Sequence, residues 1–342
     1  MKKFLTISID VEPDCSPDWS YSNPLSFRGM HEGIAKILHP LFGRYDIKPT
    51  YLMNNVVMDD PGSVELMNNL PGKFELGTHL HPEFIEPEKE FFDYAGKSAR
   101  RNCCFYPPEI EREKLVSITR LFERSFGHKP TSFRAGRFSA GPNTIKSLWE
   151  LGYKVDTSVT PHIKWNDATR EHPVNFLNAP EQPYFIKEGT ITGPSTIKAG
   201  LLQIPVTIGL LKRNPFQELA ASGLGFRRKI NWNRRIWLRP AFSRFEDMKT
   251  LINQYSRRYH DREAIVFNMM FHNVEVLPGL SPYTLSQEAC DNYLHELESF
   301  FEYCNMHDIE SIGLSDTYPM FIEKPVIQMA NALRSNVINM IS

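Results

Sequence analysis

The stretch Phe4–Glu12, with the sequence FLTISIDVE, decides the fold. Five of the six residues from Phe4 to Ile9 are apolar or β-branched, and carboxylates begin at Asp10. An almost wholly apolar strand is typical of a parallel sheet that is buried on both faces. In an α/β barrel the loops beyond the carboxyl ends of the strands form the active site. We therefore expect Asp10 and Glu12 to serve in metal binding or base catalysis; the alternative is that they are solvated or capping charges.

Strand patterns alternate with helix patterns along the rest of the chain. Further strands are predicted over 49–53, 74–79, 131–135, 153–158, 201–208, 264–271 and 309–314. Helices are predicted over 30–45, 63–69, 109–126, 143–151, 246–259 and 286–306. This alternation favours parallel β/α units that close into a barrel.

Two long connections interrupt the alternation. We expect a single barrel over 1–320 with surface insertions at about 160–200 and 209–245, followed by a helical tail over 321–342. In the second insertion, basic residues are interleaved with aromatic ones: Lys212, Arg213, Phe216, Phe226, Arg227, Arg228, Lys229, Trp232, Arg234, Arg235, Trp237 and Arg239. This composition suits peripheral contact with an anionic membrane or a lipid-linked saccharide. The alternative is an excursion that packs its aromatic side chains on the barrel.

The composition excludes several classes of protein. With 41% hydrophobic and 23% charged residues, the 342-residue chain can bury a sizeable core. A net charge of −1 argues against a nucleic-acid partner. The apolar stretch near the N-terminus is too short for a signal peptide, and we expect no transmembrane segment. Five cysteines without zinc-site spacing indicate reduced thiols, and we expect a cytoplasmic protein.

Polar side chains recur at the carboxyl ends of the predicted strands. When several successive strands end in this way, their side chains meet at one mouth of a barrel. Carboxylate oxygens and imidazole nitrogens are the ligands of a hydrolytic divalent ion, and three such ligands leave a coordination position open. The candidates are Asp10, Glu12, His79, His81, Arg134, Arg137, Asp156 and His272.

Each candidate also has a structural interpretation. Only one of His79 and His81 could lie in the mouth. Arg134 could be the ion-pair partner of any carboxylate, and Asp156 could cap a turn.

Five ordered motifs resemble those of the polysaccharide deacetylases, the carbohydrate esterases of NodB homology. The motifs are SIDVE (8–12), ELGTHLHP (75–82), SFRAGRF (132–138), VDTS (155–158) and MFHNVE (270–275). IPV (204–206) and PGLSPY (278–283) also resemble stretches of one bacterial branch of that family. The resemblance spans nearly the whole chain. It implies a distorted (β/α) barrel of the glycoside hydrolase/deacetylase type that removes N- or O-acetyl groups from a saccharide or a sugar precursor.

The resemblance also implies a cofactor and roles for the residues. One divalent metal ion, zinc or alternatively nickel or cobalt, would be bound by Glu12, His79 and a further residue. Asp10 would be the general base that activates the attacking water, and Arg134 would hold Asp10 in place. By the same resemblance, His272 would protonate the leaving amine or alkoxide, and Asp156 would orient His272.

The chain departs from the family pattern at two positions. The family has two adjacent aspartates after the first strand, whereas Val11 separates Asp10 from Glu12 here. The second histidine of the family stands four residues after the first, where this chain has Glu83. We expect His81 to take that place as the third metal ligand, because Pro82 ends strand pairing and lets His81 turn toward the side that His79 faces. Glu83 and Asp14 are the alternative ligands.

Two other functions fit parts of the pattern. A glycoside hydrolase on the same type of barrel needs two carboxylates beside the scissile bond, and Glu275 or Glu83 together with Asp156 could supply them. Arg134 and His272 would then lack an obvious role. A non-catalytic barrel that binds a glycan would explain an altered set of metal ligands.

Overall fold

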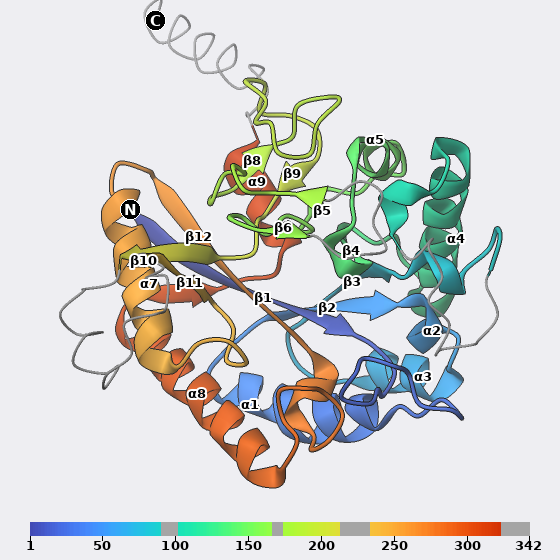
Figure 1. The fold of residues 1–342 in the computed structure, drawn as a ribbon, viewed down its shortest axis with the longest axis horizontal. Coiled ribbons are helices and arrows are strands. Elements are labelled where there is room, and N and C mark those ends of the chain that lie inside the picture. Colours follow the sequence, from blue (N-terminus) through green and yellow to red (C-terminus); the bar gives the residue numbers. More distant parts are fainter. Residues whose placement is uncertain (90–101, 166–173, 213–232, 323–342) are drawn as a thin grey trace, which may run out of the picture.

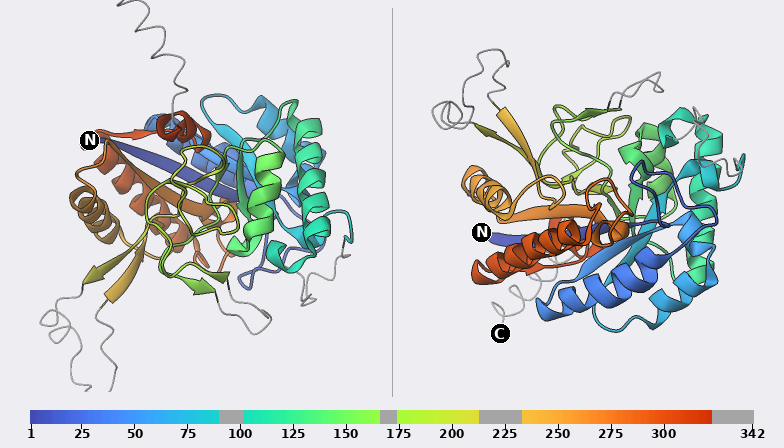
Figure 2. Two further views of the ribbon diagram at one scale, coloured as in Figure 1. Left: turned by 90° about the horizontal axis from the view of Figure 1, so that it is seen from above. Right: turned by 60° about the horizontal axis from the view of Figure 1, so that its bottom comes forward.

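A computed structural model describes residues 1–89, 102–165, 174–212 and 233–322 of the chain. They form a curled sheet with the strand order β12-β1-β2-β3-β4-β5-β9-β8, in which β13 also pairs with β1 (Figure 1). Helices pack around the outside of this sheet (Figure 1 and Figure 2). The predicted α/β fold of the distorted-barrel type is therefore confirmed.

The main sheet is mostly parallel, and two small hairpins stand outside it. Its strands are β1 (Lys2–Val11), β2 (Pro49–Asn54), β3 (Glu75–Leu80), β4 (Ser132–Ala135), β5 (Val155–Asp156), β8 (Tyr184–Phe185), β9 (Leu202–Gln203), β12 (Ala264–His272) and β13 (Ile309–Ser311). The hairpins pair β6 (Lys164–Trp165) with β7 (Val174–Asn175), and β10 (Ile208–Lys212) with β11 (Asn233–Trp237).

Long helices cover the sheet and short helical turns follow several strands. The first helix is a π-helical segment, η1 (Gly29–Leu38), which continues into α1 (His39–Arg44). The other α-helices within the described residues are α2 (Asn55–Met58), α3 (Pro61–Asn69), α4 (Pro108–Phe126), α5 (Pro142–Glu150), α7 (Phe245–Arg258), α8 (Gln287–Met306) and α9 (Tyr318–Phe321). The 3₁₀ turns are η2 (Pro82–Phe84), η3 (Cys103–Phe105), η4 (Gly136–Phe138), η5 (Asn273–Val276) and η6 (Ser315–Thr317).

Strand β1 is buried and has paired neighbours on both sides, as its apolar sequence predicts. Its residues from Phe4 to Val11 are all buried, and it pairs in parallel with β12 on one side and β2 on the other. The register aligns the strand ends: Asp10 stands opposite His272, and His79 on β3 stands opposite Arg134 on β4. Parallel pairing therefore gathers the polar side chains that follow each apolar run.

The sheet curls far enough for β12 to meet the segment after β9. The Thr207 amide donates to the Asn268 carbonyl at 2.9 Å, and the Asn268 amide donates to Thr207 Oγ1 at 2.8 Å. This contact joins β12, at one edge of the sheet, to the segment that follows β9 near the other edge. The strand ends therefore curve around the mouth of the barrel.

Several predicted elements differ from the structure. The predicted strand 201–208 is divided between β9 and β10, because Pro205 has no N–H to donate to a ladder. The strand predicted over 153–158 is reduced to β5, Val155–Asp156. Antiparallel pairing of β10 with β11 was not predicted, because a long segment separates the two strands in the sequence.

Parts of the predicted insertions and the tail lie outside the described residues. These parts are 166–173, 213–232 and 323–342, so the helical tail, its boundary and most of the basic second insertion stay predictions. Within the described part, Arg239 is buried rather than solvated. All five cysteines are free thiols, as expected. Among the described helices, none combines the length and the apolar character that a membrane crossing requires.

Candidate active site

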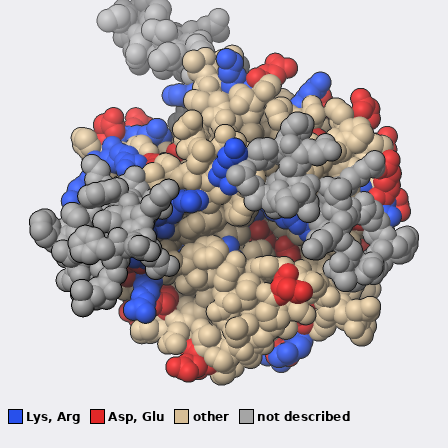
Figure 3. Space-filling model, in the orientation of Figure 1, with Lys and Arg blue, Asp and Glu red and all other residues tan. Residues whose placement is uncertain are grey.

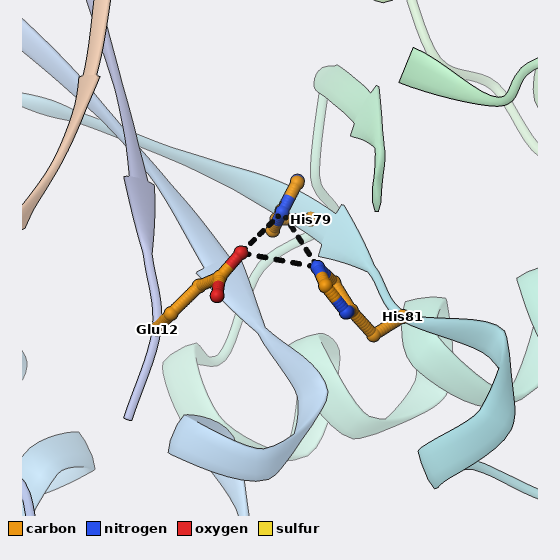
Figure 4. Close-up of side chains that lie close together, drawn as sticks. All are labelled: Glu12, His79 and His81. Atoms are coloured by element: carbon orange, nitrogen blue, oxygen red, sulfur yellow. Dashed lines mark hydrogen bonds and ion pairs between the residues drawn. The ribbon is translucent and has the colours of Figure 1, made fainter. Parts of the chain in front are cut away.

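The three predicted ligands converge at the carboxyl ends of β1 and β3. Glu12 Oε1 lies 3.1 Å from His79 Nε2 and 3.0 Å from His81 Nε2, and the two Nε2 atoms lie 3.1 Å apart (Figure 4). All three side chains are buried. Donor atoms held at 2.0–2.1 Å from a tetrahedral zinc are about 3.3 Å apart, so this triangle has the dimensions of one face of a coordination shell. Among the described residues, this is the group of carboxylate and imidazole donors that could hold a metal ion.

The two histidines face the same side because residues two apart on a strand share a face. β3 stops at Leu80, and His81 begins the turn into η2. His81 therefore lies outside the paired strand, and its ring tilts toward that of His79. Gly136 provides the space for its ring: a Cβ at that position would stand 2.7 Å from His81 Cδ2 and 2.8 Å from the Leu80 carbonyl oxygen. The glycine in the motif SFRAGRF thus serves the imidazole of a different motif.

Outer contacts orient the three donor groups. His79 Nδ1 lies 3.1 Å from the Arg134 carbonyl oxygen, so Nδ1 carries the proton and Nε2 offers its lone pair to the centre. The Tyr21 hydroxyl donates to Glu12 Oε2 at 3.2 Å. The Glu12 main chain exchanges two hydrogen bonds with the Asn273 side chain, at 2.9 and 3.0 Å. Such second contacts are typical of protein metal sites.

The electrostatics of the triangle also fit a divalent cation. Burial opposes ionisation of Glu12, but His81 and His79 hold the pKa of this carboxyl well below its usual range. Burial alone would lower the pKa of His81, yet the Glu12 carboxylate raises it to about 9. In the absence of a metal ion, a proton on His81 therefore compensates the Glu12 charge. The donor set consists of one carboxylate and two imidazoles, which suits zinc and similar ions.

The two alternative ligands are engaged elsewhere. Glu83 Oε1 accepts a hydrogen bond from Arg137 at 2.8 Å, and Arg137 outweighs burial to lower the pKa of Glu83 to about 2. The same oxygen lies 3.7 Å from His81 Nδ1, on the side of the ring that faces away from the triangle. Asp14 accepts hydrogen bonds from Ser26 Oγ at 2.6 Å and from the amides of Arg28 and Gly29 at 2.9 and 2.8 Å, at the start of η1.

Asp10 lies beside the triangle and is tied to Arg134. Arg134 Nη1 donates to Asp10 Oδ1 at 2.7 Å, and the fully buried guanidinium also donates to Ser8 Oγ at 2.6 Å and to the Thr157 carbonyl at 3.0 Å. Burial would raise the pKa of Asp10, but the Arg134 cation outweighs it, so the pKa of Asp10 is lowered. The predicted pairing of Asp10 with Arg134 is thus present.

His272 stands across the site from this pair. Its Nε2 lies 3.9 Å from Asp10 Oδ2 and 4.0 Å from Glu12 Oε1. These separations are longer than a hydrogen bond, so Nε2 faces both carboxylates without being bound to either. The Trp19 ring packs against the imidazole, with 4.6 Å between the centroids.

The expectation that Asp156 orients His272 is wrong. Asp156 Oδ1 and Oδ2 accept hydrogen bonds from the hydroxyl and the amide of Ser158, at 2.7 and 3.0 Å. Burial raises the pKa of Asp156 to about 6. The carboxylate at His272 Nδ1 is instead that of Glu275, with Oε1 at 2.8 Å. The 3₁₀ turn η5 makes this contact, because it brings the residue three positions after His272 back to the imidazole.

Glu275 and Arg239 are the residues whose roles at the site sequence reasoning missed. The spacing of His272 and Glu275 in MFHNVE was a usable signal, since residues three apart face each other in a helical turn. Nothing local marks Arg239, which reaches Glu275 from the end of the β10–β11 hairpin.

The face of the molecule around these strand ends is hollowed. Figure 3 shows a depression near the centre of the view, with acidic side chains visible inside it. Six partly exposed aromatic residues, which we call the aromatic arc, form a chain of ring contacts at 5.1–6.4 Å between centroids. Its members are Trp19, Tyr283, Phe242, Trp237, Phe138 and Trp165. The arc begins against His272 and reaches Phe138, whose ring lies 5.9 Å from the Arg134 guanidinium.

Solved structures with a similar fold include enzymes of several activities. A protein from Mycobacterium smegmatis assigned as a polysaccharide deacetylase is 13% identical, with 94% of this chain and 91% of that chain covered and a TM-score of 0.52. The Puue allantoinase is 16% identical, with coverages of 92% and 88% and a TM-score of 0.51. A GH57 branching enzyme from Thermococcus kodakaraensis is 11% identical, with coverages of 95% and 72% and a TM-score of 0.50.

At these identities the similarity establishes the fold and leaves the activity open. No family model and no curated protein sequence matches the chain.

Proposed function

We propose that the protein is a metal-dependent hydrolase that removes acetyl groups from an N- or O-acetylated saccharide or sugar precursor. The observation that carries the proposal is the convergence of Glu12, His79 and His81 between Asp10 and His272. A divalent ion bound to this triangle, with zinc the first candidate, would supply Lewis acidity and lower the pKa of water. Everything else in the reaction falls to side chains of the chain itself.

Asp10 has the position and the charge of a general base. Arg134 keeps it ionised and fixes Oδ1, which leaves Oδ2 directed toward His272. In the proposed reaction water attacks the acetyl carbonyl carbon and gives its proton to Asp10. The bond from that carbon to the sugar nitrogen or oxygen then breaks, and the leaving atom takes a proton from His272 Nε2. Acetate and a free amine or hydroxyl are the products.

The aromatic arc supports a saccharide as the substrate. Tryptophan, tyrosine and phenylalanine present flat apolar faces, and tryptophan and tyrosine add a polar edge. Trp19 and Phe138 have φ angles of 66° and 54°, a conformation that bulky residues rarely adopt. Strained backbone that persists around a site is a reason to infer function there.

The geometry favours this function over a glycoside hydrolase. A glycosidase needs one carboxylic acid that keeps its proton near neutral pH. Arginine cations outweigh burial at both Glu83 and Glu275 and lower the pKa of each to about 2, which leaves no proton to donate. Asp156, whose pKa is raised to about 6, is fully buried and accepts bonds from Ser158 on both oxygens.

The test is to incubate the protein with zinc, nickel or cobalt and a panel of N- and O-acetylated mono- and oligosaccharides. Mass spectrometry of the products then separates loss of an acetyl group from cleavage of a glycosidic bond. We expect loss of acetyl groups with the sugar chain intact. Shortened sugar chains would instead support the glycosidase, and binding without either product would support a glycan-binding barrel.

A further inference from the structure

The carboxylate that contacts the proposed acid is held in place from several sides. Glu275 Oε1 accepts from the His272 amide at 3.0 Å and lies 2.8 Å from His272 Nδ1. Arg239 Nη2 donates to the same oxygen. The hydroxyl of Tyr293, on α8, donates to Oε2 at 3.0 Å. With both oxygens engaged, the side chain of Glu275 has little freedom to rotate.

Arg239 is itself held by two neighbouring aromatic rings and by a sulfur contact. The rings of Phe242 and Tyr283 lie 4.8 and 5.1 Å from it, and Nη1 contacts Met270 Sδ at 3.2 Å. The residue is only 3% exposed, and Glu275 is fully buried. A buried arginine of this kind carries a large desolvation cost that its paired carboxylate must offset. A buried ion pair is weak evidence for stability by itself, so we looked for a functional reason for this one.

That reason is the direction of the His272 ring. Arg239 Nη2 lies 3.2 Å from His272 Nδ1, next to the bond from Nδ1 to Glu275. With Glu275 Oε1 locked, Nδ1 must donate to it, and Nε2 then points toward Asp10 and Glu12. A ring held in this way presents Nε2 at the place where a leaving group would need a proton.

We propose that Arg239 is a positioning residue that acts through Glu275 to hold His272 ready to protonate the leaving group. The inference rests on the proposed function for its chemistry, but the geometry that it describes can be measured separately. It also assigns a role in the site to the end of the β10–β11 hairpin.

The first test compares two leaving groups in the variant Arg239→Met. An N-acetylated saccharide needs a proton on its amine, whereas the nitrophenolate of 4-nitrophenyl acetate leaves without one. We expect kcat on the saccharide to fall about 100-fold or more, with the activated ester changed by only a few fold. Equal losses on both substrates would mean that Arg239 is merely structural, and no loss on the saccharide would also overturn the proposal.

The control variant is Arg258→Met. Arg258 likewise pairs with a buried glutamate, Glu181, whose pKa is also lowered to about 2 despite burial, by bonds from His162, Tyr259 and Arg258. This pair joins α7 to the first insertion, and within the described residues it forms no ion pair with His272 or Asp10. The ratio of the two activities in Arg258→Met should equal that of the wild type.

The second test does not depend on activity. In metal-free protein labelled with ¹⁵N-histidine, NMR should show His272 protonated at Nδ1 in the wild type and in Arg258→Met. Arg239→Met should lose this fixed tautomer while the other histidine signals persist. The same tautomer in both wild type and Arg239→Met would overturn the proposal. If the wild type hydrolyses neither substrate, the proposed function fails and this measurement alone decides the role of Arg239.

Discussion

The Nε2 atoms of His79 and His81 lie only 3.1 Å apart, and one residue, Leu80, stands between the two in the sequence. Side chains two apart on a regular strand share a face but stand farther apart than this, so both rings must tilt toward one point. They do so because β3 ends at Leu80 and Glu12 Oε1 attracts both nitrogens.

This relationship predicts which side chain binds the metal ion. Replacing His81 by alanine should remove a direct ligand and abolish measurable binding of zinc in a titration. Replacing Glu83 by alanine should cost no more than about 10–100-fold in affinity, because Glu83 lies behind the His81 ring. Loss of binding in Glu83→Ala with retention in His81→Ala would instead establish the four-residue spacing of the deacetylase pattern.

A backbone position supports the same ring. In Gly136→Ala the new Cβ would crowd His81 Cδ2 and the Leu80 carbonyl, so the imidazole must move and zinc affinity should fall at least tenfold. Gly43→Ala on α1 is the control, because no atom lies within 4 Å of the added Cβ. Its zinc affinity should match that of the wild type. Equal affinities in the two variants would show that the His81 ring has space to adapt.

The buried pair of Arg134 and Asp10 should matter for stability as well as chemistry. Arg134→Met leaves the Asp10 carboxylate buried without its cation, which should lower the free energy of unfolding by about 3–5 kcal/mol in urea denaturation. Adding Asp10→Asn to this variant should restore part of the loss, since the unpaired charge disappears. The exposed pair of Arg112 and Glu150 is the control, and Arg112→Met should cost about 0–1 kcal/mol. A similar cost for both arginines would contradict the pairing.

Metal binding should release a proton from His81. The Glu12 carboxylate raises the pKa of His81 above its usual 6.5, to about 9, so the metal-free protein holds this proton at pH 7. Stability from the charged pair is therefore full below about pH 6.5 and is lost as the pH rises through 9. Calorimetric titration of zinc at pH 7 in buffers of different ionisation enthalpy should give release of about one proton from this group. Release that stays the same at pH 7 and above pH 9 would contradict this assignment.

Much of the fold follows from local patterns in the sequence. Phe4–Ile9 and Ala264–Phe271 are mostly apolar, so their strand character and the position of Asp10 and His272 at the strand ends were predictable. Parallel pairing then places those ends side by side, and the grouping of Glu12, His79 and His81 follows from the same rule.

The remaining features depend on contacts that local patterns do not encode. Glu275, not Asp156, contacts His272, because the turn after β12 folds Glu275 back onto the imidazole. Which of two carboxylates lies closer to the ring depends on the three-dimensional fold, which local patterns do not show. Arg239 reaches that carboxylate from a hairpin whose strands are joined by a long connection. In the sequence Arg239 looks like a surface residue, because arginine is rarely fully buried unless it is paired. Its partner, Glu275, could not be identified from the sequence.

The most direct test of the central claim is to titrate zinc into metal-stripped protein while acetate release from an N-acetylated oligosaccharide is followed. The account predicts no release without metal and a rate that levels off at one ion per chain. The variant Asp10→Asn should bind the same single ion yet be slower by about 10²–10⁴-fold, because Arg134 still finds an oxygen acceptor while the base is lost. Acetate release by stripped protein, or an undiminished rate in Asp10→Asn, would contradict it.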